Sequence, residues 1–182
     1  KPSPKEGEVL IKVVATSINR PDLVQRQGNY PPPSGDSEIL GLEVAGTIEA
    51  LGEGVTGWKV GDRVISLVGG GGYAEYAVAY ASHLMPIPDS MSYEEAACVC
   101  ESYITAFLNV FMIGDLQDGQ TVILHGGGGG VNTAAIQLAK ALTDAQGGSS
   151  LADALRNVPG ITIGAAEGGQ IGNNINLNGF SA

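Results

Sequence analysis

The chain has 182 residues, of which 43% are hydrophobic and 15% charged, as in a folded globular protein rather than a disordered one. Its formal net charge of −10 argues against a nucleic-acid-binding surface and against attraction to anionic lipid, because both need a basic face. Two cysteines, Cys98 and Cys100, cannot form a disulfide framework, so we expect a reducing compartment. The first residues, KPSPKEGEV, show no apolar stretch of a signal peptide.

The first ninety residues predict several short strands at close spacing. The segment 8–17 is rich in β-branched residues and reads as a strand, and the segment 19–35 reads as a helical turn followed by a proline-rich loop. The segment 40–52 predicts a strand whose glycines allow close approach of backbones. Further strands follow the Gly61-Asp62 turn and the glycine loop at 69–72, so the pattern predicts a compact, barrel-type β domain.

After this β-rich part, the spacing of apolar residues changes from that of strands to that of helices. Ser90 or Ser92 is a plausible N-cap, and apolar residues then recur at helical spacing up to Phe107. The apolar stretch 96–113 is interrupted by polar residues, and we expect it to be too polar for a membrane span. A buried strand is predicted at 121–124.

The segment HGGGGGVNTAAIQLAK, from His125, predicts a glycine loop that runs into a helix over 131–142. Glycines expose backbone N–H groups to a phosphate, and the helix that follows adds the positive end of its dipole. The order strand, glycine loop, helix therefore indicates a nucleotide site, although a glycine-rich connector without a ligand has the same local pattern.

Several ordered motifs in residues 1 to about 142 resemble the zinc-free quinone oxidoreductase branch of the medium-chain dehydrogenase/reductase superfamily. The resemblance is carried by GEVLIKVVATSINRPDLVQRQGNYPPPSG, LGLEVAGTIEALGEGV, GWKVGDRV, GGGGYAEYAV, ESYITAF and the glycine loop. It implies an α/β chain in which a GroES-like β-barrel substrate domain precedes a Rossmann domain. It also implies a cytoplasmic enzyme that uses NADPH to reduce quinones or other conjugated carbonyls, as a possible homodimer.

The resemblance also implies roles for single residues. Asn19, Asp22 and Tyr30 would line the substrate pocket, and Thr105 would lie near the nicotinamide. The pyrophosphate would be held by Gly126, Gly129, Gly130, Val131 and Asn132. From the residues alone, Asn19 and Asp22 are equally explained as a helix cap beside Pro21, and Tyr30 as loop packing against Pro31 to Pro33.

We expect no metal site. Zinc relatives carry ligands near the positions of Asn19 and Leu42, but Leu42 is apolar, and zinc needs three or four Cys, His or carboxylate ligands in a cluster. Cys98 and Cys100 are expected to be small buried residues on a helix. Hydride transfer needs no side-chain nucleophile, since the cofactor carries the chemistry.

Two departures from the family pattern stand out. Asn132 occupies the place of the family's last loop glycine, where a side chain could displace the helix or block the phosphate. No alternation of strands and helices follows Leu142, so the predicted strand at 121–124 would lack neighbours in its sheet. We therefore expect weak or no activity from this chain.

The last forty residues differ in sequence pattern from the rest of the chain. Residues 151–158 predict a short helix ended by Pro159-Gly160, and 161–182 alternate like small hairpins around Gly-rich turns. The runs ALRNVPGI and NINL resemble the plug domain of TonB-dependent siderophore receptors, with Asn178 where that family usually has Arg. An inert Gly/Asn-rich tail is the alternative.

The two resemblances together predict a hybrid chain. Its parts would be a GroES-like substrate domain over 1–95, the start of a Rossmann NADPH-binding domain over 96–142 and a plug-like α+β tail over 143–182. An artificial fusion, a join of two gene models and an assignment of residues from two sources all fit the sequence. The rival functions are a transport or binding module based on the tail and a hybrid without activity.

Overall fold

The computed structural model describes residues 1–144, 161–164 and 174–177. The chain divides into two compact units, Lys1–Glu101 and Ser102–Ala182. The domain boundaries expected near residues 95 and 142 stay predictions. The helix expected over 151–158 lies outside the described residues.

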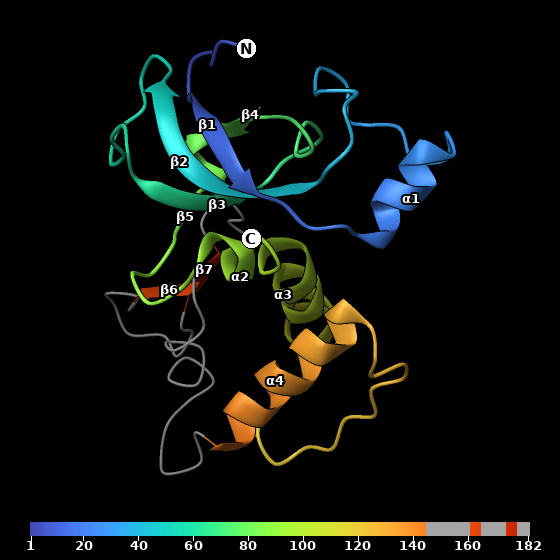
Figure 1. The fold of residues 1–182 in the computed structure, drawn as a ribbon. Helices are drawn as coiled ribbons and strands as arrows, with labels where there is room; N and C mark the ends of the chain where they lie inside the picture. Colours follow the sequence, from blue (N-terminus) through green and yellow to red (C-terminus); the bar gives the residue numbers. More distant parts are fainter. Residues whose placement is uncertain (145–160, 165–173, 178–182) are drawn as a thin grey trace. The chain divides into compact units, whose positions relative to one another are not determined.

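The first unit is built on a five-stranded antiparallel sheet (Figure 1). Its strands lie in the order β4-β1-β2-β3-β5, with β4 and β5 at the edges. Their bounds are β1 Glu8–Ala15, β2 Glu43–Leu51, β3 Arg63–Leu67, β4 Tyr76–Tyr80 and β5 Met85–Pro86, and the short helices α1 (Arg20–Arg26) and η1 (Ala81–His83) lie between them. The expected strands are confirmed, and the closed barrel stays a prediction.

The sheet forms because β1, β2 and β3 supply β-branched residues to one core. Val9 and Ile11 of β1 are fully buried and pack with Val44 and Ile48 of β2. Gly46 explains the close approach of β1 and β2, since a Cβ there would lie 2.2 Å from the Lys12 carbonyl oxygen. The expectation that a glycine in this strand allows close backbone approach is thereby confirmed.

Three helical segments follow the sheet: α2 (Tyr93–Ala96), α3 (Cys100–Phe107) and the π-helical η2 (Leu108–Ile113). Ser92 is the N-cap of α2, and its hydroxyl accepts from the Glu95 N–H, so one of the two expected caps is confirmed. The helical stretch Tyr93–Ile113 contains an 18-residue window with a mean hydropathy of 1.6, which meets the length and composition of a membrane span, contrary to our expectation for this stretch. Core helices share these properties, and Phe107 and Phe111 are buried here.

The second unit contains α4 (Gly130–Asp144), which confirms the helix expected over 131–142. Its apolar face, Ala134, Ala135 and Leu138, packs against Phe107 and Phe111. In the tail, β6 (Ile161–Gly164) and β7 (Asn174–Leu177) pair antiparallel, as expected for short strands in this part of the chain.

The buried strand predicted at 121–124 is wrong. The segment runs between Gln120 and His125 without forming a strand. Ile123 is 78% exposed and Val122 38% exposed. A strand requires a hydrogen-bonded neighbour, and the described residues provide none beside this segment. Its apolar composition alone was not enough to place it in a sheet.

Candidate functional site

Asn19 and Asp22 meet at the start of α1. Asn19 is the N-cap of α1, and its backbone N–H donates to Asp22 Oδ2 over 2.7 Å. The other carboxylate oxygen of Asp22 accepts from the Gly41 N–H over 3.2 Å. Asp22 is only 2% exposed, so these bonds replace its lost hydration. The interpretation of both residues as a helix cap is confirmed, and their place in a substrate pocket stays a prediction.

Glu43 is the residue at this site that sequence reasoning missed. It begins β2 and is 1% exposed. Its Oε1 accepts from the Ser17 hydroxyl and, over 2.7 Å, from Asn19 Nδ2. Its Oε2 accepts from the Glu101 N–H over 3.0 Å. The available signal was an acidic residue inside the apolar run LGLEVAG, where an unpaired charge would be costly.

The buried carboxylates shape the protonation of their neighbours. Burial, and then the Asp22 carboxylate, raise the pKa of Tyr73 to about 12. Burial and the negative charges of Glu43 and Asp22 raise the pKa of Glu101 above its usual range. Burial, followed by the charge of Glu43, raises the pKa of the Cys100 thiol well above its usual value. Burial and the nearby carboxylates therefore favour the neutral forms of Tyr73, Glu101 and Cys100.

The two cysteines differ. Cys100 is buried, as expected, but Cys98 is exposed and lies in the turn between α2 and α3, so the expectation for Cys98 is wrong. Its Sγ lies 3.5 Å from the carbonyl oxygen of Glu94. Burial and the charge of Glu43 raise its pKa, which keeps Cys98 a thiol rather than a nucleophilic thiolate.

The remaining pocket candidates are not tied into this network. Tyr30 lies in the loop after α1 and is 46% exposed. Thr105 lies in α3, in the second unit, where its backbone carbonyl accepts from Asn109 Nδ2 over 2.8 Å. Among the described residues, no group of three or more His, Cys, Asp or Glu side chains could hold a metal ion.

The glycine loop lies open at the start of α4. Gly126 has a φ of +77°, which glycine adopts without strain. A Cβ at Gly128 would meet nothing within 4 Å, whereas one at Gly130 would lie 3.0 Å from Ser102 Oγ. The helix begins at Gly130, and the hydroxyl of Thr133 donates to the Gly129 carbonyl over 3.0 Å. The loop thus presents exposed backbone beside a helix N-terminus.

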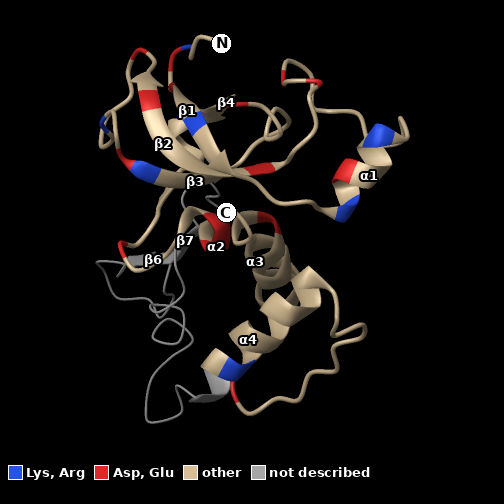
Figure 2. Cartoon of the chain, viewed as in Figure 1, with Lys and Arg blue, Asp and Glu red and all other residues tan. Residues whose placement is uncertain are grey.

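Asn132 folds back onto this loop. Its Nδ2 donates to the Gly126 carbonyl over 3.1 Å, which holds the side chain against the loop. The first turn of α4 contains no acidic residue, and Figure 2 shows charged residues only near the other end of this helix. The N-terminus of α4 therefore keeps its positive dipole end uncompensated by side chains.

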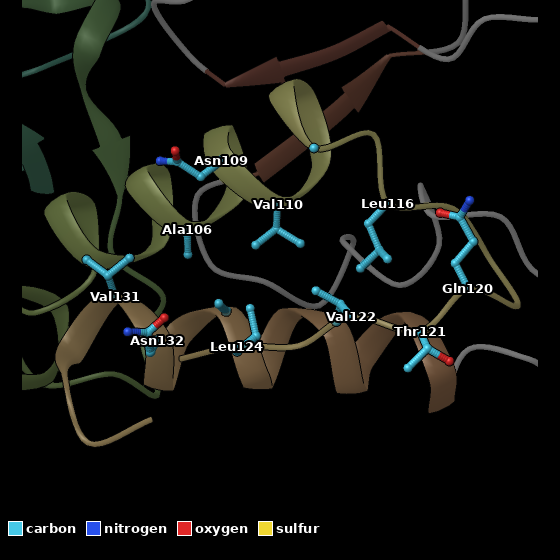
Figure 3. A pocket seen from close by; sticks show the side chains of 12 residues that line it. Ala106, Asn109, Val110, Leu116, Gln120, Thr121, Val122, Leu124, Val131 and Asn132 are labelled. Carbon is cyan, nitrogen blue, oxygen red and sulfur yellow. The ribbon is translucent and has the colours of Figure 1, made fainter. Parts of the chain in front are cut away.

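A cavity of about 750 Å³ lies within the second unit, between η2, the segment 116–124 and α4. Figure 3 shows the side chains of Val110, Leu116 and Val122 pointing into it. Its volume is in the range of ligand pockets, but its lining is mostly apolar and it borders the unpaired segment 121–124.

Comparison with known proteins matches two families. Residues 5–89 match the alcohol dehydrogenase GroES-like domain, and residues 129–182 match the TonB-dependent receptor plug domain. The chain is 42% identical over 144 residues to the synaptic vesicle membrane protein VAT-1 homolog of Danio rerio, covering 79% of this chain and 30% of that protein. It is 39% identical over 141 residues to a quinone oxidoreductase of Lama guanicoe, covering 77% and 43%.

Solved structures agree. A mycobacterial protein in complex with NADPH matches with a TM-score of 0.70 and 39% identity, over 78% of this chain and 44% of that one. The chain spans about a third of the length of the curated relatives it matches first. With its GroES-like sheet and its glycine loop, the chain belongs over its N-terminal part to the medium-chain dehydrogenase/reductase superfamily, and its last residues match the receptor plug domain.

Proposed function

We propose that this chain is the N-terminal portion of a zinc-free, NADPH-dependent quinone oxidoreductase, with the substrate-side domain and the start of the cofactor domain, and that the chain by itself is weakly active or inactive. The complete enzyme would transfer a hydride from NADPH to a quinone or a conjugated carbonyl, in the cytoplasm and as a homodimer. The observation that carries the proposal is the open glycine loop, Gly126 to Gly130, which leads into the uncharged first turn of α4. The likeness to a quinone oxidoreductase supports the choice of substrate class.

The loop fits one part of NADPH, the pyrophosphate. Gly126, Gly129, Gly130, Val131 and Asn132 would hold it, through exposed backbone and the helix dipole. The Asn132 amide, bonded to the Gly126 carbonyl, rigidifies the loop rather than displacing α4, which begins two residues earlier.

The rest of the dinucleotide does not fit the described residues. A dinucleotide crosses the edge of a parallel sheet, where a residue after the second strand binds the ribose. Here the segment 121–124 has no neighbouring strand, and the described strands beyond α4, β6 and β7, pair antiparallel with each other. The described residues therefore offer no sheet edge along which the adenosine half would bind.

The residues at the two positions where zinc relatives carry ligands favour a zinc-free site. Leu42, 8% exposed, supplies no ligand atom at one of the two expected zinc positions. Asn19 at the other position is committed to Glu43 and Ser17 through its amide nitrogen. Bound NADPH would supply the hydride, and the protein's part would be to bind and orient the acceptor.

The test is a titration of this chain with NADPH, followed by nicotinamide fluorescence, beside an Asn132→Gly variant. We expect no binding tighter than a Kd of about 1 mM for either chain, equivalent to about −4 kcal/mol. An Asn29→Gly variant, which changes an exposed asparagine of the first unit, is the matched control.

Micromolar binding by the unchanged chain would contradict the expected inactivity and would mean that the tail completes the site. Binding by the Asn132→Gly chain alone would place the defect in the loop. Binding by neither chain would support the absence of the remaining sheet as the cause.

A second candidate rests on the match of residues 129–182 to the receptor plug domain, which would make the tail part of a transport or binding module. A ferric siderophore titrated into the chain by calorimetry tests it. We expect no heat of binding, since a plug works together with the membrane barrel that surrounds it. A saturable signal that is lost on removal of 145–182 would favour the binding module instead.

A further inference from the structure

We propose that the segment 121–124 is an interaction surface for a second copy of this chain, and that the two identical segments pair through their backbones. The proposal goes beyond the proposed function and does not depend on NADPH, on a substrate or on enzyme activity. Three properties of this segment carry it, namely its unpaired backbone, its side chains and the charge around it.

The backbone of 121–124 makes no hydrogen bond within the part of the chain that the structure describes. The last backbone bond before the segment is donated by the N–H of Gln120, and the next one along the chain is accepted by the carbonyl of Gly126. Gly119 and Gly126 have φ values of +76° and +77°, so the segment lies between two positions of left-handed backbone. A strand-forming segment with unpaired N–H and C=O groups is a template for pairing with another chain.

The side chains of this segment favour a strand. Thr121, Val122 and Ile123 are β-branched, and the stretch 120–125 contains no glycine, proline, lysine, arginine or carboxylate. Stretches of six residues with this composition pair readily with copies of themselves. Ile123 is 78% exposed and does not line the cavity of the second unit, whereas Val122 and Leu124 do. Ile123 is therefore open to packing against the same segment of another molecule.

The distribution of charge favours a second copy as the partner. The chain has a formal net charge of −10, but no lysine, arginine, aspartate or glutamate occurs from 119 to 139, its longest uncharged run. Two copies repel each other through the rest of their surfaces, and this repulsion is weakest along the uncharged run. A basic partner would instead be attracted to the acidic residues elsewhere in the chain. An uncharged segment that is the same in both molecules therefore suits self-pairing.

The contact is small, so the association should be weak. A stable interface uses roughly 20–30 residues from each partner, and the stretch 120–125 is much shorter. We therefore expect association in concentrated and not in dilute solution. Because the net charge opposes the contact, added salt should strengthen it, whereas salt would weaken a contact between opposite charges.

The test combines sedimentation equilibrium with backbone hydrogen exchange followed by NMR, both on the full chain between about 10 μM and 1 mM. We expect the average mass to rise with concentration and to rise further with salt. At least two alternate amides of 121–124 should exchange roughly fivefold more slowly at the highest concentration, the ratio for one net hydrogen bond. Alternate amides are expected because every second N–H of a strand faces a given neighbour. The amides of β1, which is paired on both sides, should not change.

A pair of lysine variants locates the contact. Ile123→Lys should weaken the association roughly tenfold or more, because it removes an apolar side chain and places like charges side by side. Ile113→Lys makes the same chemical change at the end of η2, where the isoleucine is 69% exposed. It should leave the association within about twofold of the unchanged chain. The two variants have the same net charge, so their difference reports the position alone.

Four results would overturn the proposal. A mass that stays constant up to the highest concentration would exclude the association. Protection of 121–124 that does not depend on concentration would mean that the segment pairs within its own chain. Association without protection of 121–124, or equal losses in Ile123→Lys and Ile113→Lys, would place the contact on another surface. Neither readout involves NADPH or a substrate, so failure of the proposed enzyme activity would not affect the result.

Discussion

The carboxylate of Asp22 accepts a hydrogen bond from the backbone N–H of Gly41, over 3.2 Å, and so ties α1 to the chain just before β2. The two residues are 19 positions apart in sequence. Because Asp22 also binds the Asn19 N–H, one buried side chain fixes both the start of α1 and the approach to Glu43. The polar groups of the candidate pocket thus depend on Asp22 for their placement.

Asp22→Asn should destabilise the first unit. The amide nitrogen of the new side chain would face one of the two N–H donors that the carboxylate now accepts, leaving a buried donor unsatisfied. We expect a loss of about 1–3 kcal/mol in the free energy of unfolding, measured by urea denaturation. Asp89→Asn changes an exposed carboxylate and is the control, which should stay within about 0.5 kcal/mol of the unchanged chain. Equal effects of the two variants would show that the Asp22 bonds contribute little.

Gly41→Ala should be more damaging than an alanine at another glycine of positive φ. Gly41 has a φ of +101°, and a Cβ there would lie 2.6 Å from the Tyr73 backbone nitrogen. Gly57 has a φ of +81° but open space around it, so Gly57→Ala measures the backbone cost alone. We expect about 1–2 kcal/mol for Gly57→Ala and clearly more for Gly41→Ala, by urea unfolding. Similar losses at the two sites would mean that the Tyr73 segment yields readily.

Tyr73 should make the stability of the first unit depend on pH in the alkaline range. Its folded pKa of about 12 lies above the ordinary value of 10.0, so the unfolded chain loses this proton first. The stabilisation from neutral Tyr73 is therefore complete below pH 10 and is lost as the pH rises towards 12. We expect Tyr73→Phe to remove the latest phase of the tyrosine absorbance titration.

A variant with Tyr80→Phe serves as the matched control, because it removes one phenol but keeps Tyr73 and Asp22. It should retain the late phase. Asp22→Asn, where it folds, should move that phase to lower pH, since it removes the negative charge that opposes ionisation. A late phase that survives Tyr73→Phe would assign the raised pKa to another tyrosine.

Two isoleucines, one exposed in the segment 121–124 and one buried in β2, compare the cost of removing an exposed and a buried side chain. Ile123 is 78% exposed on the unpaired segment, whereas Ile48 is 1% exposed in β2. We expect Ile123→Ala to change the free energy of unfolding by less than about 0.5 kcal/mol. Ile48→Ala should cost about 2–5 kcal/mol, because it leaves a cavity in the core. A large loss at Ile123 would indicate that this residue is buried in solution.

The sequence by itself determined the local elements. Alternating β-branched residues gave β1, and the cap pattern at Asn19 and Ser92 gave the starts of α1 and α2. The glycine loop and the apolar face of α4 were equally readable, because each depends on residues within a few positions of one another. Family resemblance extended this to the superfamily and to the match of the tail with the plug domain.

Tertiary structure alone decided which groups are buried together. The bond between Glu43 and the Glu101 N–H joins positions 58 residues apart, and no local pattern shows which distant groups would pair with Glu43 in the core. The segment 121–124 has the composition of a strand but no partner among the described residues, since pairing is a property of two segments and not of one. Local propensity sets the helices and turns, whereas sheets and buried polar networks arise only when distant parts of the chain come together.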